Sequence, residues 1–539
     1  MKRALTRWLS IGVVAFCLAG LAFLAYVYIT RPQTGQGPLA QPTDLSSTSS
    51  SPTPDVRLPK LDLAAGVMLG EDITAQVRET NSSQYGGPPQ DFRPGHAQPR
   101  ALTDVKVERT SQGFIIHIPS GSPIPTPTIY EGKLYISGGF RSREYYCFDA
   151  HTGQPIWAAS LSDDGPSSAV CNDKIVVFNT ESCTLFALDA DTGKHLWSHW
   201  LGDPLTSTPA ISDGIVFTSY PIQGRHASGL DKSPPNASHA LVALDLRTGQ
   251  VRWQRWIDSD VMTAPVCVGE YVWVVSFAGT LYQFRKTDGA IISARSGRFT
   301  SAPVVFRDQL VVTQRTVDAT NNVAEQILAQ NAKDSTVFFH ASKRPAPYLD
   351  ANVQEQTAYA KMSLLLDQAN GFAAPPAAAN FMAAKANIGQ SAVFALQNYL
   401  GSRILPYQGK LYSNMGNMLV CVDSQDGKTQ WQVEVPGDLH HEGGHLAGPP
   451  VAAGGQIFLA TVSGEVLQVD PENGQIVKRY QVGAPIRSQP VLYDGHIYVS
   501  TADGRVVCVN TGDRKYTGWF TLGANMAHTN VAEPTEQSR

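Results

Sequence analysis

The sequence predicts an all-β fold: a β-propeller of eight four-stranded antiparallel blades, with an N-terminal transmembrane helix and a mostly helical insertion between blades 5 and 6. Two observations support the propeller. One pattern of apolar strands and tight polar turns recurs roughly every 40 residues, a period typical of repeated four-stranded blades. Several copies also end in Trp eight residues after an Asp, as in the run from Asp189 to Trp197.

The Asp and the Trp of each copy have different structural roles. The Asp accepts backbone N–H bonds in a turn, and the Gly that follows supplies a positive φ. A buried indole removes roughly 200 Å² from water, so we interpret the Trp side chains as structural contacts between blades. The clear copies contain Asp149 with Trp157, Asp189 with Trp197, Asp245 with Trp253 and Asp423 with Trp431, and degenerate copies end at Ser293, Phe339, Lys478 and Trp519.

The N-terminus predicts a membrane segment. Residues 1–8 carry Lys2, Arg3 and Arg7, which predicts that this end stays in the cytoplasm. The apolar run over residues 9–30 reaches roughly 30 Å as a helix, enough to cross a bilayer. A cleaved signal peptide is the alternative, but the run is long for one and ends in aromatic residues.

The remaining segments follow from composition. Residues 31–100 are rich in Pro, Ser and Thr and predict a disordered linker, with a weak helical signal near residues 63–77. We expect the propeller over residues 101–524 and a C-terminal tail over 525–539. The strand at Gly113–Ile118 has no partner strands of its own, so we expect it to close the ring by pairing with the last blade near Trp519.

The long connections predict a working surface on one face of the ring. The connections after the second and fourth strands of a blade emerge on the same face, and all the long ones belong to that set. They include the insertion at 343–400, whose helical pattern predicts either a lid or a docking face for another protein. Loops of this length are usually functional or disordered. The candidate binding residues are Arg141, Arg143, Arg225, His226 and His440.

One loop carries a metal-binding pattern in an unsuitable context. His441, Glu442 and His445 match the H-E-x-x-H pattern of zinc proteases. That chemistry needs both His side chains on one face of a helix, whereas two consecutive Gly residues oppose a helix here. We expect a polar loop without catalysis and keep these three residues as weak metal candidates.

Composition argues against nucleic-acid binding. The 539 residues carry a net charge of −4 with scattered Lys and Arg, whereas nucleic-acid binders present a basic surface. The cysteines show no C-x-x-C spacing. A disulfide between Cys171 and Cys183 stays open as a hypothesis.

The chain contains tandem segments such as ALDADTGKHLW and ALDLRTGQVRW. They resemble the repeat of the quinoprotein-like (PQQ-repeat) propellers, and the resemblance covers about three quarters of the chain. Two branches of this family have eight blades: PQQ-dependent alcohol dehydrogenases and non-enzymatic propellers similar to the outer-membrane β-barrel assembly lipoproteins. The adjacent Cys pair of the dehydrogenases is absent here. Phe16 before Cys17 also departs from the lipid-attachment pattern of the lipoproteins.

The resemblance to the second branch implies a non-catalytic scaffold without a cofactor. It would bind envelope or membrane proteins through the loop face that carries residues 343–400, in outer membrane protein assembly. Together with the predicted anchor, this gives a single-pass inner-membrane protein whose propeller lies on the periplasmic side. The alternatives are a dehydrogenase that uses PQQ with Ca²⁺, or a ligand-sensing ectodomain.

Overall fold

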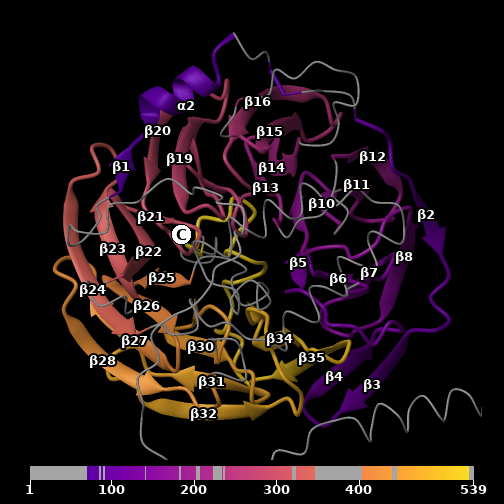
Figure 1. Cartoon of the computed structure of the whole chain (residues 1–539). Helices are drawn as coiled ribbons and strands as arrows, with labels where there is room; N and C mark the ends of the chain where they lie inside the picture. The colour runs from indigo at the N-terminus through magenta and orange to yellow at the C-terminus, as the bar shows by residue number, and fades with distance from the viewer. Residues whose placement is uncertain are drawn as a thin grey trace, which may run out of the picture. The chain divides into compact units, whose positions relative to one another are not determined.

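The computed structural model describes residues 70–83, 87–88, 92–139, 141–180, 184–201, 207–222, 234, 237–317, 323–345, 403–439 and 446–532. All of them belong to the second of two units, Leu63–Arg539. The strands of this unit form eight antiparallel sheets arranged around a common centre (Figure 1). The prediction of an eight-bladed propeller with four-stranded blades is confirmed.

The predicted transmembrane segment at 9–30 lies outside the described residues, as does the insertion apart from residues 343–345, which end a strand. In the part of the chain that is described, no helix combines the length and the apolar character that a membrane crossing requires.

We call the blades A to H, and we give their strands from the innermost to the outermost. Blade A has β5 (Thr128–Tyr130), β6 (Lys133–Ser137), β7 (Glu144–Asp149) and β8 (Pro155–Leu161), and blade B has β9 (Val170–Asn172), β10 (Ile175–Phe178), β11 (Thr184–Asp189) and β12 (His195–Trp200). Blade C has β13 (Ala210–Ser212), β14 (Ile215–Pro221), β15 (His239–Asp245) and β16 (Val251–Ile257), and blade D has β17 (Val266–Val268), β18 (Tyr271–Val275), β19 (Thr280–Arg285) and β20 (Ile291–Ser296).

The second half of the ring has the same plan. Blade E has β21 (Val304–Phe306), β22 (Gln309–Val317), β23 (Val323–Asn331) and β24 (Val337–Pro345), and blade F has β25 (Ile404–Tyr407), β26 (Lys410–Met415), β27 (Met418–Asp423) and β28 (Thr429–Glu434). Blade G has β29 (Val451–Ala453), β30 (Gln456–Ala460), β31 (Glu465–Val469) and β32 (Ile476–Gln481), and blade H has β33 (Val491–Tyr493), β34 (His496–Ser500), β35 (Arg505–Asn510) and β4 (Gly113–His117).

The middle strands of the blades are apolar on both faces because neighbouring blades cover both faces. In β11 the first five residues are buried, and in β10 all four are buried. Side chains of a strand alternate between its two faces, so such runs place apolar groups in both interblade layers. The core is therefore a series of layers between blades.

Blade H is completed by a strand from the start of the propeller sequence. β4 pairs antiparallel with β35, with Ile115 opposite Val507. Across the same seam, the hydroxyl of Tyr498 donates a hydrogen bond to the carbonyl of Ala150 in blade A at 2.8 Å. The expectation that Gly113–Ile118 closes the ring with the last blade is confirmed. Its partner is β35, however, and not the segment near Trp519.

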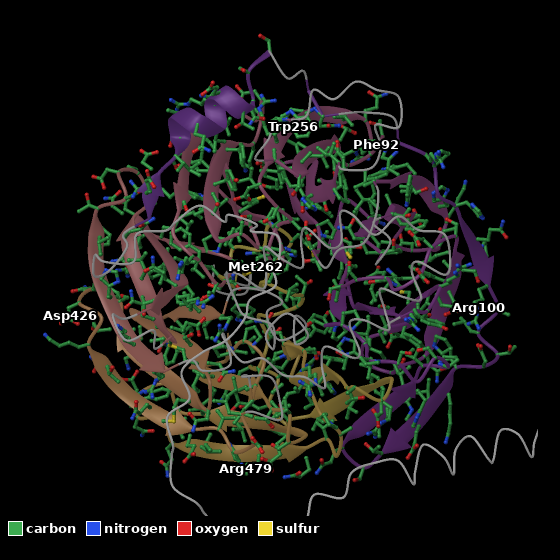
Figure 2. All side chains as sticks on the ribbon, viewed as in Figure 1. Phe92, Arg100, Trp256, Met262, Asp426 and Arg479 are labelled. Atoms are coloured by element: carbon green, nitrogen blue, oxygen red, sulfur yellow. The ribbon has the colours of Figure 1, made fainter. Side chains whose placement is uncertain are left out.

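The described residues between 70 and 110 form a belt along the outer edges of the blades (Figure 1). β3 (Lys106–Thr110) adds to β4 of blade H, β2 (Ala97–Arg100) adds to β8 of blade A, and β1 (Glu71–Asp72) adds to β20 of blade D. Figure 2 shows Arg100 of β2 at this outer rim.

Between these strands the belt contacts blades B and C. Arg93 forms a β-bridge with Trp200 at the edge of blade B. The side-chain amide of Asn81 donates to the carbonyl of Trp256 at 3.2 Å and accepts from its N–H at 2.8 Å, on blade C. The helix α2 (Thr74–Thr80) packs against β16 and β20. Five consecutive blades, D, C, B, A and H, thus carry the belt.

The belt corrects part of the linker prediction. Where residues 70–100 are described, they form β1, α2 and β2 and not a disordered linker. Composition predicts disorder for a segment that cannot bury enough apolar surface to form a core of its own. This segment needs none, because the exposed edges of finished blades satisfy its backbone hydrogen bonds.

The C-terminal segment, residues 519–532, lies at the centre of the ring (Figure 1). Its backbone carbonyls accept hydrogen bonds from innermost strands of four blades. These bonds run from Leu492 to Trp519, from Ile129 to Phe520, from Ile211 to Met526 and from Cys267 to Ala527, at 2.7, 2.6, 3.0 and 3.0 Å. The described part of the predicted tail therefore belongs to the propeller.

Candidate functional site

The long connections start and end on one face of the ring, which we call the loop face. The first and second strands of each blade are joined on the opposite face by two-residue turns, as at Glu131–Gly132 in blade A. On the loop face, the chain runs from Pro221 to His239 within blade C and from Pro345 to Ile404 between blades E and F. This is the distribution that the sequence predicts.

Two of the predicted binding residues are described, and both are exposed. Arg141 and Arg143 lie in the connection between β6 and β7, on the loop face of blade A. The carbonyl of Ser142 accepts from Gly165 N–H at 2.8 Å, and that of Arg143 accepts from Leu161 N–H at 2.7 Å. These bonds hold the backbone of the loop that carries the two exposed Arg residues.

The other predicted site residues lie outside the described part of the chain. They are the binding candidates Arg225, His226 and His440 and the metal candidates His441, Glu442 and His445. Among the described residues, no group of three or more His, Cys, Asp or Glu side chains is arranged to hold a metal ion. Cys171 is a buried free thiol, so the suggested bridge to Cys183 is wrong.

Four of the Trp residues share one contact with the next blade. The indole N–H donates to a turn carbonyl of that blade, and the ring lies against the Gly of the same turn. Trp157 donates to Ala190 at 3.0 Å, Trp197 to Leu246 at 2.9 Å, Trp253 to Lys286 at 2.8 Å and Trp431 to Pro471 at 3.0 Å.

The Asp residues of the same copies order these turns. Each carboxylate accepts a backbone N–H of its own turn. The bonds run from Thr152 to Asp149 at 2.7 Å, from Thr192 to Asp189 at 2.8 Å, from Thr248 to Asp245 at 3.0 Å and from Gln425 to Asp423 at 2.7 Å. The hydrogen bond from Arg252, aided by those from Thr248 and Arg247, lowers the pKa of Asp245 to about 2. These Asp side chains shape turns that receive the neighbouring indole.

Trp519 does not have this position. Its carbonyl pairs with Leu492 on the innermost strand of blade H, and its buried indole nitrogen has no hydrogen-bond partner. The outer strand of blade H is β4, so the docking position of that blade belongs to Phe114, which lies on Gly153 of blade A. The sequence pattern missed Phe114 because it precedes the repeats, and the interpretation of Trp519 as an equivalent docking residue is corrected.

A buried ion pair fixes the point where the chain returns from residues 346–402. Arg403 and Glu325 are 2% and 1% exposed, and Arg403 Nη1 lies 2.6 Å from Glu325 Oε1. Thr300 donates to the same carboxylate oxygen at 2.7 Å, and Arg403 Nη2 donates to the carbonyl of Asn414 at 3.0 Å. A buried pair with this many hydrogen bonds fixes geometry even where its net contribution to stability is small.

The other end of the same connection is also attached to blade F. Arg344, near the end of β24, donates to the side-chain oxygen of Gln432 on β28. Arg344 and Arg403 therefore fix the two ends of the connection at the junction of blades E and F. Sequence reasoning did not identify this role, because a single Arg in a long loop carries no pattern.

A buried carboxyl group lies on the loop face between blades C and D. Asp260 is fully buried, and Ser219 donates to its Oδ1 at 2.5 Å, while Oδ2 has no hydrogen-bond partner. Burial raises the pKa of Asp260 to about 7. Perturbed carboxyls of this kind occur both in functional sites and in structural networks. Nothing in the sequence distinguishes this Asp from its neighbours.

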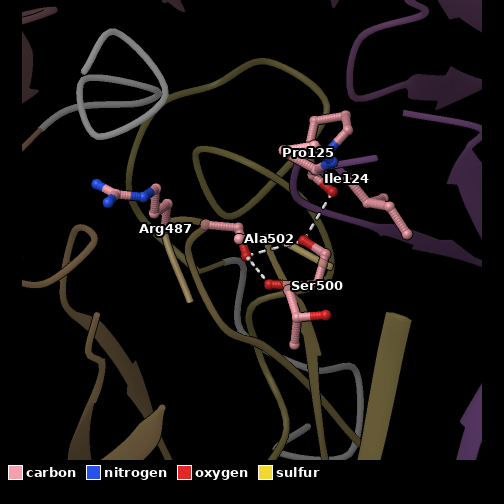
Figure 3. Close-up of a pocket in the computed structure, with 8 residues that line it drawn as sticks. Ile124, Pro125, Arg487, Ser500 and Ala502 are labelled. Atoms are coloured by element: carbon pink, nitrogen blue, oxygen red, sulfur yellow. Dashed lines mark hydrogen bonds between the residues drawn. The ribbon is translucent and has the colours of Figure 1, made fainter. Parts of the chain in front are cut away.

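The pocket that the described residues form is small beside the quinone of the dehydrogenase branch. The centre of the ring holds residues 519–532, and a pocket lined by Ile124, Pro125 and Arg487 among others has a volume of about 10 Å³ (Figure 3). A tricyclic cofactor needs a site of several hundred Å³. In Figure 3 the Arg487 guanidinium points away from Ser500, whose hydroxyl donates to the Pro125 carbonyl at 2.8 Å.

Comparison with known proteins gives one family. A family model described as "Outer membrane protein assembly factor BamB" matches residues 109–264, 237–374 and 415–532, more than half of the chain. No curated protein matches the sequence.

Similar solved structures include both functional branches. BamB from Moraxella catarrhalis is 14% identical with a TM-score of 0.43, covering 77% of this chain and 97% of that chain. Quinohemoprotein alcohol dehydrogenase from Comamonas testosteroni is 13% identical with a TM-score of 0.47, covering 77% and 78%. Sqt1 from Saccharomyces cerevisiae is 8% identical with a TM-score of 0.47, covering 73% and 96%. Likeness at this level does not distinguish a scaffold from an enzyme.

Proposed function

The chain belongs to the family described as outer membrane protein assembly factor BamB, and from this premise we propose that it is a non-catalytic scaffold, tethered to a membrane, that binds protein partners of the cell envelope. Outer membrane protein assembly is the process that the family description suggests. The observation that carries the proposal is the collection of long connections on a single face of a rigid ring.

The junction of blades E and F is the proposed centre of the binding surface. The connection that starts after Pro345 and ends before Arg403 is the longest on the loop face. The Arg344 bond to Gln432 and the buried pair of Arg403 with Glu325 hold its two ends. Binding groups work best when a rigid scaffold fixes their base, which supports a docking role for this connection.

The proposed tether is the apolar run over residues 9–30. The basic residues Lys2, Arg3 and Arg7 precede it, and the positive-inside rule then orients the propeller to the periplasmic side of the inner membrane. Deletion of residues 9–30 should release the protein from washed membranes into the soluble fraction. Retention on the membrane after this deletion would contradict the tether.

Partner capture tests the scaffold. The full-length chain is crosslinked mildly in its native host and purified, beside a variant in which residues 346–402 are replaced by a short Gly-Ser linker. A matched control replaces residues 202–206, in the connection between blades B and C, in the same way. We expect envelope proteins that crosslink to the full chain and to the control but not to the first variant. Equal recovery from both variants would contradict a docking surface at blades E and F.

The enzyme alternative has a direct assay. The purified chain is supplied with PQQ, Ca²⁺, a primary alcohol and a dye acceptor, beside a known quinoprotein as positive control. We expect no dye reduction above that of the buffer. Robust turnover would overturn the non-catalytic proposal.

A further inference from the structure

Residues 523–531 form a closed loop within the C-terminal segment at the centre of the ring, and we call this loop the plug. Its two ends meet where the N–H of Asn530 donates to the carbonyl of Gly523 at 3.0 Å. Inside the loop, the side-chain oxygen of Asn525 accepts from the N–H of Ala527 at 3.1 Å. The plug is therefore a distinct element with hydrogen bonds of its own, and not a continuation of any blade.

The plug is attached to the innermost strands of blades B, C and D. The N–H of Cys171 on β9 donates to Met526 Sδ at 2.9 Å, although sulfur is a weak acceptor. The N–H of Ile211 on β13 donates to the carbonyl of Met526 at 3.0 Å. The N–H of Cys267 on β17 donates to the carbonyl of Ala527 at 3.0 Å. Each of these three blades thus contributes a single described hydrogen bond to the plug.

The residues just before the plug, 519–522, are attached to the ring more firmly. Trp519 and Leu492 form an antiparallel bridge at the inner edge of blade H. The hydroxyl of Thr521 donates to the carbonyl of Ala169 at 3.2 Å. The chain therefore has an anchored part, which the plug follows.

The docked plug buries polar atoms that have no hydrogen-bond partner among the described residues. His528 is 2% exposed, and both of its ring nitrogens are in this condition. So are Asn530 Oδ1 and Gln489 Nε2, although Gln489 Oε1 accepts from the N–H of Gly523 at 3.3 Å. A buried polar group without a partner destabilises the state that buries it. Because these atoms are already covered, they weaken the docked plug and do not mark an empty site.

The backbone of the plug is strained at three positions. Ala524, His528 and Asn530 have φ values of 75°, 54° and 57°. A left-handed backbone costs free energy for a residue with a Cβ, and such residues cluster in segments that switch between conformations. Release of the plug would relieve this strain and expose the buried polar atoms to water.

We propose that the plug is displaceable: residues 523–531 leave the axis of the ring together while residues 519–522 and all eight blades stay in place, and protonation of His528 favours the released state. Release frees the N–H groups of Ile211 and Cys267 at the inner edges of blades C and D. The proposal concerns a conformational change of the chain and does not depend on the proposed scaffold function.

His528 makes the docking of the plug depend on pH. Burial lowers the pKa of His528 to about 3, and no charged or titratable group of the described residues contributes to the shift. Its backbone contacts lie within the plug, since its N–H donates to the carbonyl of Asn525 at 3.0 Å and a Cβ on Gly523 would be 3.0 Å from its Cα.

The sign of the pH effect follows from the two states of His528. In the released plug the imidazole is hydrated and has its ordinary pKa of 6.5. Below pH 6.5 the released state therefore binds more protons than the docked state. Docking is strongest above pH 6.5 and weakens as the pH falls below this value.

Residue-resolved hydrogen exchange on the full-length chain in detergent tests the plug. The amides of Ile211 and Cys267 report its release, and those of Leu492 and Ile129, which donate to Trp519 and Phe520, report the anchored part. After correction for the intrinsic effect of pH on exchange, the first two amides should exchange about tenfold faster at pH 5.5 than at pH 7.5. The last two should not change. No acceleration at Ile211 and Cys267, or equal acceleration at all four amides, would overturn the proposal.

A His528→Asn variant tests the origin of the pH effect. Asn tolerates a positive φ but takes up no proton, so the pH dependence at Ile211 and Cys267 should disappear. His195→Asn, on the outermost strand of blade B, is the matched control and should retain it. Retention of the pH dependence in His528→Asn, or its loss in both variants, would overturn the role of His528.

An Asn525→Ala variant tests the plug independently of pH. It removes the side chain that holds the loop together, so exchange at Ile211 and Cys267 should become about tenfold faster at pH 7.5. Exchange at Leu492 should stay as in the unaltered chain. The matched control is Asn417→Ala in blade F, which should change neither. Unchanged exchange at Ile211 and Cys267 in Asn525→Ala, or an equal acceleration at Leu492, would overturn a separately released plug.

Discussion

The indole of Trp157 in blade A lies on Gly193 in the turn of blade B. A Cβ on Gly193 would be 2.6 Å from the indole ring, and the φ of this Gly is 70°. The contact therefore needs Gly for two separate reasons: space for the ring and a left-handed backbone. The same relationship recurs for Trp197 with Gly249 and for Trp253 with Gly289.

Replacement of Gly193 should destabilise the ring in two ways, because a side chain would collide with the indole and would strain the left-handed backbone. For Gly193→Ala we expect a loss of about 2–5 kcal/mol in the free energy of unfolding, from the backbone cost of about 1–2 kcal/mol and the overpacking cost of about 1–3 kcal/mol. Gly214→Ala is the matched control, because Gly214 also has a φ of 70° but no atom within 4 Å of its Cβ position. Chemical denaturation measures both. Equal losses for the two variants would contradict a packing role of the Gly193 contact.

The closure of the ring should depend on Phe114. This side chain is 1% exposed and lies on Gly153 of blade A, so Phe114→Ala should cost about 3–5 kcal/mol. The variant should also become more sensitive to proteases at β4, since this strand is attached to β35 without a covalent turn from the same blade. Limited proteolysis followed by mass spectrometry measures the cleavage.

Phe338→Ala is the control for this prediction. Phe338 is 44% exposed and lies one residue before the docking position of blade E. We expect little change in stability or in cleavage at β4. A loss for Phe338→Ala as large as that for Phe114→Ala would mean that ring closure is not specifically affected.

The repeated blades were predictable from the sequence because each copy needs the same turn and the same contact with the next blade. The turn with Asp189 and Gly193 and the docking residue Trp197 recur with fixed spacing, so the blades and the faces on which loops emerge follow from the sequence. Trp519 shows the limit of this reasoning. A Trp after an Asp-containing run looks equivalent in sequence, yet the last blade takes its outer strand from β4.

No repeated sequence pattern predicts the belt or the C-terminal segment at the centre of the ring. Their backbone hydrogen bonds go to edges built by residues far away in sequence, as in the bond from Ile129 to Phe520. Local composition cannot report an interaction that depends on finished blades. For the same reason, the burial of Asp260 and the pairing of Arg403 with Glu325 were visible only in the folded chain.

The contributions of Arg403 and Glu325 to the free energy of unfolding should depend on each other. Replacement of one partner leaves the other charge buried without its counterion, so Arg403→Met and Glu325→Gln should each cost about 3–5 kcal/mol. The double variant should cost less than the sum of the single variants, because it leaves neither charge in the junction. Denaturation of all four proteins at one pH gives the coupling energy. A double variant as unstable as that sum would show that the two side chains act independently.

The exposed pair of Arg285 and Asp288 on blade D provides a matched cycle. Its two side chains are 46% and 53% exposed and approach to 2.8 Å. Surface pairs contribute at most about 1 kcal/mol. The coupling energy there should be several times smaller than that at the junction of blades E and F.

Asp260 should make the stability of the protein depend on pH above pH 4. The folded chain keeps Asp260 protonated up to a pKa of about 7, whereas the carboxyl of the unfolded chain ionises near the ordinary value of 3.8. The folded state therefore binds more protons in this range, and the free energy of unfolding falls as the pH rises through it. Asp260→Asn removes this titration. Relative to the unaltered chain, the variant should gain about 2–3 kcal/mol between pH 5 and pH 8.

The decisive quantity is the change with pH and not the stability at one pH, because Asn also alters the bond from Ser219. Ser219→Ala is therefore the control: it removes the same hydrogen bond but keeps the carboxyl. Without its hydroxyl donor the carboxylate is less stabilised, so the pH dependence should be retained or increased. Urea denaturation at pH 5, 6, 7 and 8 measures all three proteins. Parallel curves for Asp260→Asn and the unaltered chain would show that Asp260 ionises normally in the folded protein.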